Sequence, residues 1–402
     1  MINIAILGFG VVGGGVAELL TKNSDCVKKL GGDEVNIKYI LDLRDFPDSP
    51  FADKVVHDYN IILSDGEVDC IVEAMGGSHP AYEYTVAALK AGKSVITSNK
   101  EVVAGFGDEF LRLAEENAVC YRFEAAVGGG IPVISPMINC IGQNKITEVR
   151  GILNGTTNYI LTKMFSYGES FEQSLKDAQE RGYAERNPDA DVLGIDACRK
   201  IAILTALASG RLIPTEHIHT EGITKIRKED VVNAAKVGLS IKLLGRGILT
   251  DEGIEVMVAP FMIGSDLPLA SVNGVYNAVE VLGEPIGNVM FYGPGAGAGA
   301  TASAVVGDLV QIMRSGRNYA EPIWVKTDEG LLSFEDHVAK QYICLSGVNL
   351  KEAEEMFGKV QLVTDGEEIA FITGEMREGD VADAIDKLIK AGKTPTSRIR
   401  LI

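Results

Sequence analysis

Positive charge is scarce in this chain of 402 residues, which has 38 lysines and arginines against 56 aspartates and glutamates, a formal net charge of −18. A surface with this excess of acid attracts neither phosphate backbones nor anionic lipid over a broad area, although a local basic pocket is compatible with it. The charge balance therefore argues against nucleic-acid and membrane partners.

Paired cysteines and long apolar runs are also missing. None of the six cysteines has C-x-x-C spacing to another, so neither a zinc site nor a disulfide framework is expected. No apolar run reaches the roughly 18 residues that span a bilayer, and the first residues lack the basic start of a signal peptide. We expect a cytoplasmic protein, in which 46% hydrophobic residues are enough for two or three domains.

The first third of the chain alternates short β-branched runs with amphipathic stretches. This alternation is typical of βαβ units that form a parallel sheet. We therefore expect an α/β fold with a Rossmann-type, doubly wound parallel sheet at residues 1–128. The expected strands are residues 2–7, 36–41, 68–75, 94–98 and 120–127, and the expected helices are residues 11–22, 81–91 and 108–117.

After residue 128 the chain changes to strands separated by long helices, which predicts an α+β domain for catalysis and dimerisation at residues 129–320. A Gly/Ala-rich stretch leads into a helix, about residues 293–315, that we expect to return to the first domain. Residues 334–402 follow the order strand, helix, strand, strand, helix, strand. This βαββαβ order is typical of a small ferredoxin-like module.

A glycine-rich motif follows the first strand and opens the first helix: Gly8-Phe9-Gly10-Val11-Val12-Gly13. Glycines at these positions permit a tight turn and let a pyrophosphate approach the helix N-terminus. The spacing alone is also compatible with a purely structural turn. The strand-to-helix context favours dinucleotide binding by this motif.

The second strand ends at Asp42-Leu43-Arg44-Asp45. An acid at this place accepts a hydrogen bond from the ribose 2′-hydroxyl of NAD, whereas an arginine pairs with the 2′-phosphate of NADP. Arg44 favours NADP slightly, and charges that are merely solvated in a loop are the alternative.

Acidic residues and a lysine gather between residues 185 and 200. Asp191 is placed to cap a helix on which Asp196 and Lys200 share one face, at i and i+4. An exposed ion pair is one interpretation of this spacing. The apolar run at residues 201–204 favours a buried lysine instead, and an interior lysine is a candidate general acid.

This segment resembles the signature of the homoserine dehydrogenase family. The matching residues are Ala178, Gly182, Asn187, Pro188, Asp191, Gly194, Asp196 and Lys200, and other matching segments are Thr97-Ser98-Asn99-Lys100 and residues 124–132, 154–161 and 293–297. The resemblance covers about residues 1–320. It implies the NAD(P)-dependent interconversion of L-aspartate 4-semialdehyde and L-homoserine, in the biosynthesis of threonine, methionine and isoleucine.

The resemblance also implies a role for each matching residue. Lys200 would be the proton donor, and the other catalytic residues would be Lys100 and Asp196. The substrate would be bound by Gly182, Glu185, Asp191 and Asp196. Besides the glycine motif and Arg44, the cofactor would contact Gly76, Ser98, Lys100, Gly295 and Gly297. A monovalent cation, sodium or potassium, would be held by Glu124, Val127, Gly129 and Ile131.

Two segments depart from the family pattern. Arg44-Asp45 is followed by Phe46-Pro47-Asp48 without the lysine found there in many members, which keeps NAD and dual use open. The tail has the order of an ACT domain, an amino-acid-sensing module, but Leu345-Ser346-Gly347-Val348 replaces its usual Asp-x-Pro-Gly turn. Threonine inhibition is therefore not implied, and a dimerisation module without an effector is the alternative.

Other functions are also compatible with parts of the sequence. An aspartate semialdehyde dehydrogenase would need a thiol nucleophile, and no cysteine here has that context. A non-catalytic protein that senses NAD(P) or an amino acid is the main alternative, although Lys200, Asp196 and Glu185 are all present. The resemblance further implies a homodimer that forms through the second domain.

Overall fold

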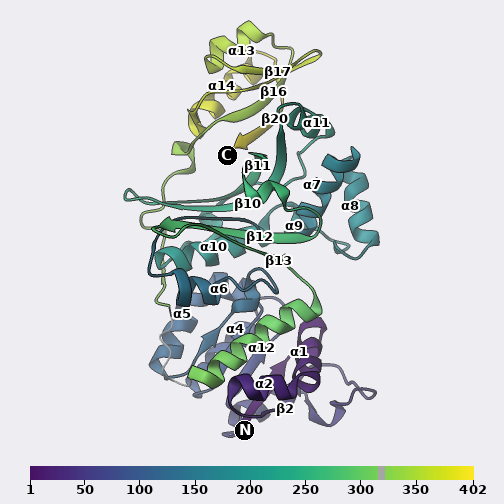
Figure 1. Cartoon of the computed structure of the whole chain (residues 1–402), viewed down its shortest axis with the longest axis vertical. Helices are drawn as coiled ribbons and strands as arrows, with labels where there is room; N and C mark the ends of the chain where they lie inside the picture. The colour runs from purple at the N-terminus through teal and green to yellow at the C-terminus, as the bar shows by residue number, and fades with distance from the viewer. Residues whose placement is uncertain (316–321) are drawn as a thin grey trace. The chain divides into compact units, whose positions relative to one another are not determined.

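A parallel sheet of six strands, in the order β3-β2-β1-β4-β5-β6, forms the centre of the first of two units into which the computed structural model divides (Figure 1). The structure describes residues 1–315 and 322–402, so the boundary expected at residue 320 lies outside the described residues. The first unit consists of Met1–Lys145, Ala202–Thr215 and Phe291–Asp328, and the second of Ile146–Ile201, Glu216–Met290 and Glu329–Ile402.

The strand order 3-2-1-4-5-6 is that of a Rossmann sheet, so the predicted doubly wound parallel sheet is confirmed. The strands are β1 (Ile2–Leu7), β2 (Val35–Leu41), β3 (Val55–Val56), β4 (Cys70–Glu73), β5 (Ser94–Thr97) and β6 (Tyr121–Arg122). The helices are α1 (Val11–Lys22), α2 (Ser24–Gly31), α3 (Tyr59–Ser64), α4 (Ala81–Lys90), α5 (Lys100–Glu116), α6 (Ile134–Pro136) and α12 (Ala298–Ser315).

Helix α12 comes from much later in the chain and packs beside α1 (Figure 1). Its Val305 and Leu309 lie in the same buried cluster as Ile4 of β1 and Val16 of α1. All of β4 and β5 is buried, as is usual for parallel strands that carry helices on both faces. Apolar side chains of β1 and α1, and of the much later helix α12, therefore share one core, as expected for a helix that returns to the first domain.

Two elements predicted in this unit are present with other bounds. The helix expected at residues 108–117 begins at Lys100, because the Asn99 side chain accepts the Glu101 N–H at 3.1 Å and caps it there. The strand expected at residues 120–127 is only Tyr121–Arg122, and a 3-10 turn, Glu124–Ala126, follows it. Residues 120–127 are buried although only two of them pair as a strand. An apolar run alone does not distinguish a buried strand from another buried segment, so the predicted strand was too long.

The second unit contains a mixed sheet in the order β13-β12-β7-β10-β11-β20-β16-β18-β17, with β9 beside β11. Its strands are β7 (Lys145–Ile152), β9 (His219–Thr220), β10 (Leu239–Leu249), β11 (Ile254–Gly264), β12 (Tyr276–Glu284), β13 (Gly287–Pro294), β16 (Gln341–Ser346), β17 (Gln361–Asp365), β18 (Glu368–Ile372) and β20 (Thr394–Leu401). The helices are α7 (Gly155–Tyr167), α8 (Phe171–Glu180), α9 (Asp189–Val192), α11 (Lys228–Lys236), α13 (Leu350–Phe357) and α14 (Glu378–Lys390). Helix α10 (Ile195–Ser209) belongs to this unit as far as Ile201 and to the first unit from Ala202.

The last four long strands have the order β20-β16-β18-β17 and are antiparallel to their neighbours among themselves. They enclose an apolar cluster of their own with α13 and α14, which includes Phe357, Phe371 and Leu388. β20 also pairs in parallel with β11, through Phe261 and Arg400. The tail therefore continues the sheet of the second unit. Two short strand pairs complete the fold, β8 (Arg211–Leu212) with β14 (Val325–Lys326) and β15 (Val338–Ala339) with β19 (Met376–Arg377).

Within the described part of the chain, no helix is both long enough and apolar enough to cross a membrane.

Candidate active site

The glycine-rich turn between β1 and α1 has the geometry that a pyrophosphate requires. Gly8 has a φ of +92°, and a Cβ there would lie 2.8 Å from the Ala74 carbonyl oxygen. A Cβ on Gly13 would lie 2.0 Å from the Gly8 carbonyl oxygen, so only glycine lets α1 approach β1 this closely. A Cβ on Gly10 would meet nothing within 4 Å. The start of α1 therefore fits the phosphates of a dinucleotide.

The end of β2 places an acid and a cation together. Asp42 accepts the N–H of Phe9 at 2.8 Å, and Arg44 donates to its two carboxylate oxygens through Nε and Nη2, each at 3.0 Å. The Arg44 guanidinium holds the pKa of Asp42 well below its usual range, so Asp42 is ionised. Arg44 itself is largely exposed and lies over the Phe46 ring. Val11 and Val12, the remaining residues of the motif, form the first turn of α1.

Three predicted cofactor residues follow the carboxyl ends of the neighbouring strands β4 and β5: Gly76, Ser98 and Lys100. Glu73, the last residue of β4, precedes these residues; sequence reasoning missed it, and it is 1% exposed. Its carboxylate accepts from the Thr97 hydroxyl at 2.5 Å and the Met75 N–H at 2.8 Å. Burial outweighs these bonds and raises the pKa of Glu73 to about 7. An acid at the end of an apolar strand was the signal in the sequence.

Gly295 and Gly297, the other predicted cofactor residues, precede α12. Gly297 has a φ of +118° and open space where a Cβ would stand. Gly129 approaches this segment, since a Cβ on it would lie 2.6 Å from the Gly295 carbonyl oxygen. The backbone of this segment therefore leaves no room for a side chain at Gly129.

The residues predicted to hold a cation lie on one buried loop, and they are Glu124, Val127, Gly129 and Ile131. The Glu124 carboxylate accepts three N–H groups at the start of α6, from Val133 at 2.7 Å, Ile134 at 2.9 Å and Ser135 at 2.7 Å. Among the described residues, no group of three or more His, Cys, Asp or Glu side chains could hold a metal ion. A cation at this loop would therefore depend on backbone carbonyl oxygens.

Lys200 is buried in the second unit, where it is 7% exposed. Its ammonium donates to the Leu153 carbonyl oxygen and to Asp196 Oδ2, both at 2.7 Å. Asp196 is 5% exposed. The interpretation of these two residues as an exposed ion pair is therefore wrong, because the apolar run after Lys200 turns this face of α10 inward.

Asn154 contacts both acids, Asp191 and Asp196. It lies in a segment that matches the family, but the sequence assigned it no role. Its amide donates to Asp191 Oδ1 at 2.7 Å and to Asp196 Oδ2 at 2.9 Å. Its side-chain oxygen Oδ1 accepts the Thr157 N–H and caps α7. Asp191 lies inside α9, and α10 begins only at Ile195, so the prediction that Asp191 caps that helix was wrong. Burial raises the pKa of Asp191, against the hydrogen bond from Asn154.

Gly182 and Glu185 lie in the loop between α8 and α9. Gly182 has a φ of +75° and donates its N–H to the Gln179 carbonyl oxygen at 3.0 Å. Glu185 is exposed, and its carbonyl oxygen accepts from Gln179 Nε2 at 3.1 Å. The predicted residues thus form two groups, one for cofactor and cation in the first unit and one with Lys200 in the second.

A Rossmann sheet with a glycine-lined phosphate turn, together with a buried lysine that donates to a carboxylate, is typical of an NAD(P)-dependent oxidoreductase. Family models agree: "Homoserine dehydrogenase, NAD binding domain" matches residues 8–124, and "Homoserine dehydrogenase" matches residues 132–310. The chain belongs to the homoserine dehydrogenase family.

Individual relatives support this membership. The homoserine dehydrogenase of Synechocystis sp. is 38% identical over 438 residues, which cover 100% of this chain and 99% of the relative. The crystal structure of a homoserine dehydrogenase from Thiobacillus denitrificans has a TM-score of 0.91 at 34% identity and covers 100% of this chain and 98% of its own. A hyperthermophilic archaeal homoserine dehydrogenase in complex with NADPH has a TM-score of 0.66 at 29% identity. The match covers 77% of this chain and 97% of the archaeal chain.

Proposed function

We propose that Lys200 is the proton donor and acceptor in the interconversion of L-aspartate 4-semialdehyde and L-homoserine. Bound NAD(P)H supplies the hydride that reduces the aldehyde carbon. Lys200 gives its proton to the aldehyde oxygen, and in the reverse direction the neutral amine takes a proton from the hydroxyl group. The single observation that carries this role is the buried ammonium held by the Leu153 carbonyl oxygen and Asp196. An ammonium at a developing alkoxide both stabilises its charge and can transfer a proton.

The other proposed catalytic residues are Asp196, which orients the Lys200 ammonium, and Lys100, a second cation for the substrate. Lys100 begins α5 directly after the carboxyl end of β5, the edge at which open α/β sheets bind ligands.

We assign the substrate's α-ammonium group to Glu185 and Asp191, with backbone contacts from Gly182. The raised pKa of Asp191 supports this assignment, because a bound ammonium would offset the cost of burying that carboxylate. Gly182 has a left-handed backbone that leaves open space where a Cβ would stand.

We propose that the cofactor is NADP or NAD, with a slight preference for NADP. The pairing of Arg44 with Asp42 supports use of both cofactors. With NAD, Asp42 would accept from the 2′-hydroxyl, whereas with NADP, Arg44 would turn from Asp42 to the 2′-phosphate. The archaeal relative in complex with NADPH supports the NADP side of this proposal.

A sodium or potassium ion would be held by the carbonyl oxygens of Glu124, Val127, Gly129 and Ile131. The fit rests on the tight turn, in which Gly128 and Gly129 have φ values of +75° and +57°. Its role would be structural, because it would stabilise a loop that packs closely on the segment before α12.

We further propose a cytoplasmic homodimer with three domains, at residues 1–128, 129–320 and 334–402. The dimer would form on the sheet of the second domain, where Tyr276 and Met290 expose apolar surface on β12 and β13. The ferredoxin-like strand order of the tail and its own apolar cluster support an ACT-like module.

The test is homoserine oxidation by the full chain, followed through nicotinamide absorbance with NAD and NADP separately. Turnover that disappears in Lys200→Ala, with cofactor binding retained, is the expected result. Cofactor binding without turnover in the parent protein would contradict the proposed function and favour a regulatory protein.

A further inference from the structure

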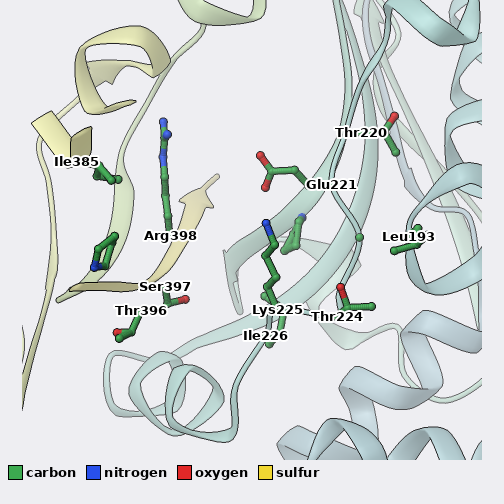
Figure 2. Close-up of a pocket in the computed structure, with 13 residues that line it drawn as sticks. Leu193, Thr220, Glu221, Thr224, Lys225, Ile226, Ile385, Thr396, Ser397 and Arg398 are labelled. Atoms are coloured by element: carbon green, nitrogen blue, oxygen red, sulfur yellow. The ribbon is translucent and has the colours of Figure 1, made fainter. Parts of the chain in front are cut away.

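A cavity of about 570 Å3 lies within the second unit, and none of its lining residues has a role in the proposed reaction. One wall is the loop at residues 220–226, and the other is formed by β20 and Ile385 of α14 (Figure 2). A cavity of this volume is in the range of pockets that hold small organic ligands.

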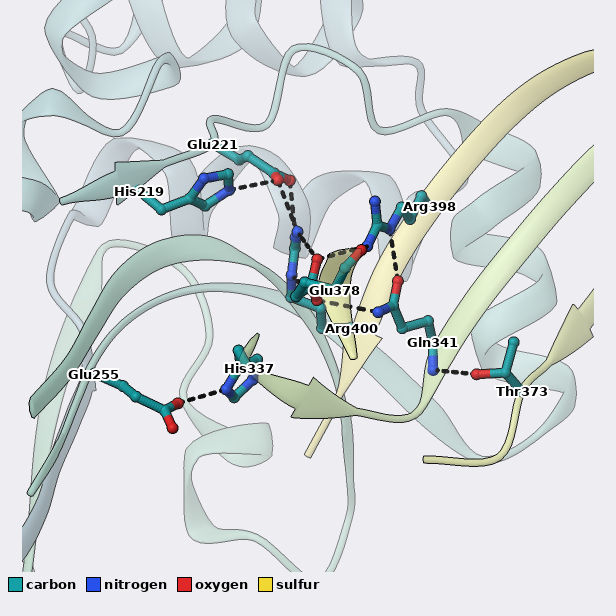
Figure 3. Close-up of polar contacts among 9 residues, drawn as sticks. All are labelled: His219, Glu221, Glu255, His337, Gln341, Thr373, Glu378, Arg398 and Arg400. Atoms are coloured by element: carbon teal, nitrogen blue, oxygen red, sulfur yellow. Dashed lines mark hydrogen bonds and ion pairs between the residues drawn. The ribbon is translucent and has the colours of Figure 1, made fainter. Parts of the chain in front are cut away.

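Two cations lie on opposite walls of this cavity. Lys225 is exposed and comes from the loop before α11, and Arg398 comes from β20 (Figure 2). Glu221 is the one carboxylate among the described residues that line the cavity. It is already paired, because it accepts from Arg400 Nη1 at 2.9 Å and from Arg400 Nη2 at 2.8 Å, and it lies 2.7 Å from His219 Nε2 (Figure 3). Glu221 is therefore paired with Arg400, and Arg398 is paired with Glu378 at 2.6 Å, so the surplus positive charge on these walls comes from Lys225.

The Arg398 guanidinium is held in position before any ligand binds. Its Nε donates to Gln341 Oε1 and its Nη2 donates to Glu378 Oε2, both at 2.6 Å (Figure 3). A side chain that is already ordered loses little conformational entropy on binding. The polar residues Thr220, Thr224, Thr396 and Ser397 line the same cavity.

We propose that this cavity binds a small monoanionic carboxylate, with its charged group between Lys225 and Arg398 and its carbon chain against Ile226 and Pro260. A phosphate monoester carries nearly two charges at neutral pH, more than the surplus on these walls. A zwitterionic amino acid also fits less well, because the carboxylate that its ammonium would need, Glu221, is already paired with Arg400.

The cavity wall contacts the segment that carries the proposed substrate acids. Leu193 lines the cavity, and the Ile223 N–H donates to the Val192 carbonyl oxygen at 2.8 Å. A Cβ on Gly222 would lie 2.0 Å from that same oxygen. The turn at residues 192–194 joins α9, which contains Asp191, to α10. A ligand that moves the loop at residues 220–226 therefore changes KM for homoserine, an effect that rests on the proposed function.

The test uses the full chain and 3-hydroxybutanoate as the probe. Calorimetric titration at constant ionic strength should give saturable binding that Lys225→Gln weakens about tenfold or more. Lys228→Gln, an exposed lysine three residues on and outside the cavity lining, should leave the affinity unchanged. Neither variant should change basal activity.

Each outcome decides one part of the proposal. Absence of saturable binding, or equal affinity in the parent and Lys225→Gln, overturns the site. Tighter binding of inorganic phosphate or threonine at the same residues overturns the monocarboxylate assignment. An unchanged KM for homoserine at saturating 3-hydroxybutanoate overturns the coupling. Because binding is measured without turnover, an inactive parent protein would refute the proposed function and leave the test of the site intact.

Discussion

Asn154 Nδ2 lies 2.9 Å from Asp196 Oδ2, the same oxygen that accepts from Lys200 at 2.7 Å. One carboxylate oxygen therefore receives an amide donor from the N-cap of α7 and an ammonium from its own helix. We infer that Asn154 positions Asp196 and that Asp196 positions Lys200.

We expect Asn154→Ala to lower kcat by about tenfold or more, because a lost hydrogen bond to a charged group costs on the order of 1.5–3 kcal/mol. It should also raise the pKa of Asp191 further, since the Asn154 hydrogen bond lowers that pKa. The pH profile of kcat/KM measures both effects. Asn349→Ala, which removes the N-cap of α13, is the matched control: it should cost stability alone. A pH profile that keeps its shape would show that Asn154 is only a helix cap.

Replacing Lys200 should remove chemistry and keep cofactor binding. We expect Lys200→Ala to lower kcat by about 10²- to 10⁴-fold, the usual contribution of a general acid. Lys200→Arg retains the cation beside Asp196 but exchanges protons poorly, so it should rescue thermal stability without activity. Stopped-flow and fluorescence titration with NADPH separate the two effects. Lys176→Ala, at a side chain 78% exposed, is the control. Near-normal turnover in Lys200→Arg would contradict proton transfer by this residue.

Arg44→Ala should change the choice of cofactor. Loss of a guanidinium from the 2′-phosphate is expected to raise KM for NADP by about tenfold or more. KM for NAD should change little or fall, because Asp42 loses the side chain that occupies both its oxygens. Parallel assays with the two cofactors give the ratio. An equal change for both would mean that Arg44 acts only through the structure of the loop.

Glu73 should make folding stability depend on pH. Its folded pKa of about 7 lies above the unfolded value of 4.5, so between these pH values the folded protein holds a proton that the unfolded chain has lost. Stability therefore falls as pH rises through this window, by up to about 3 kcal/mol. Glu73→Gln should remove this slope in denaturant melts between pH 5 and pH 8, whereas Glu354→Gln, at an exposed site, should keep it. A variant with the parent's pH dependence would contradict the burial cost assigned to Glu73.

The sequence by itself determined the order of the elements and the chemistry of the signature segments. Three of these patterns are local and could be recognised without knowing the fold: the glycines at residues 8, 10 and 13, the neighbouring Asp42 and Arg44, and the i,i+4 pair of Asp196 and Lys200. The βαβ alternation and the βαββαβ tail are local in the same sense, since hydrophobic periodicity reports on neighbouring residues.

Only the tertiary structure decided which of these residues meet and how well they are buried. Asn154 lies 42 positions from Asp196 in the chain, and no periodicity connects two residues at that separation. The raised pKa of Glu73 follows from burial, in a site that includes Thr97, 24 positions along the chain. The same holds for Lys225 and Arg398: long-range pairing of β20 with β11 places them on one cavity. Burial and long-range pairing are properties of the packed chain, and a linear pattern does not contain them.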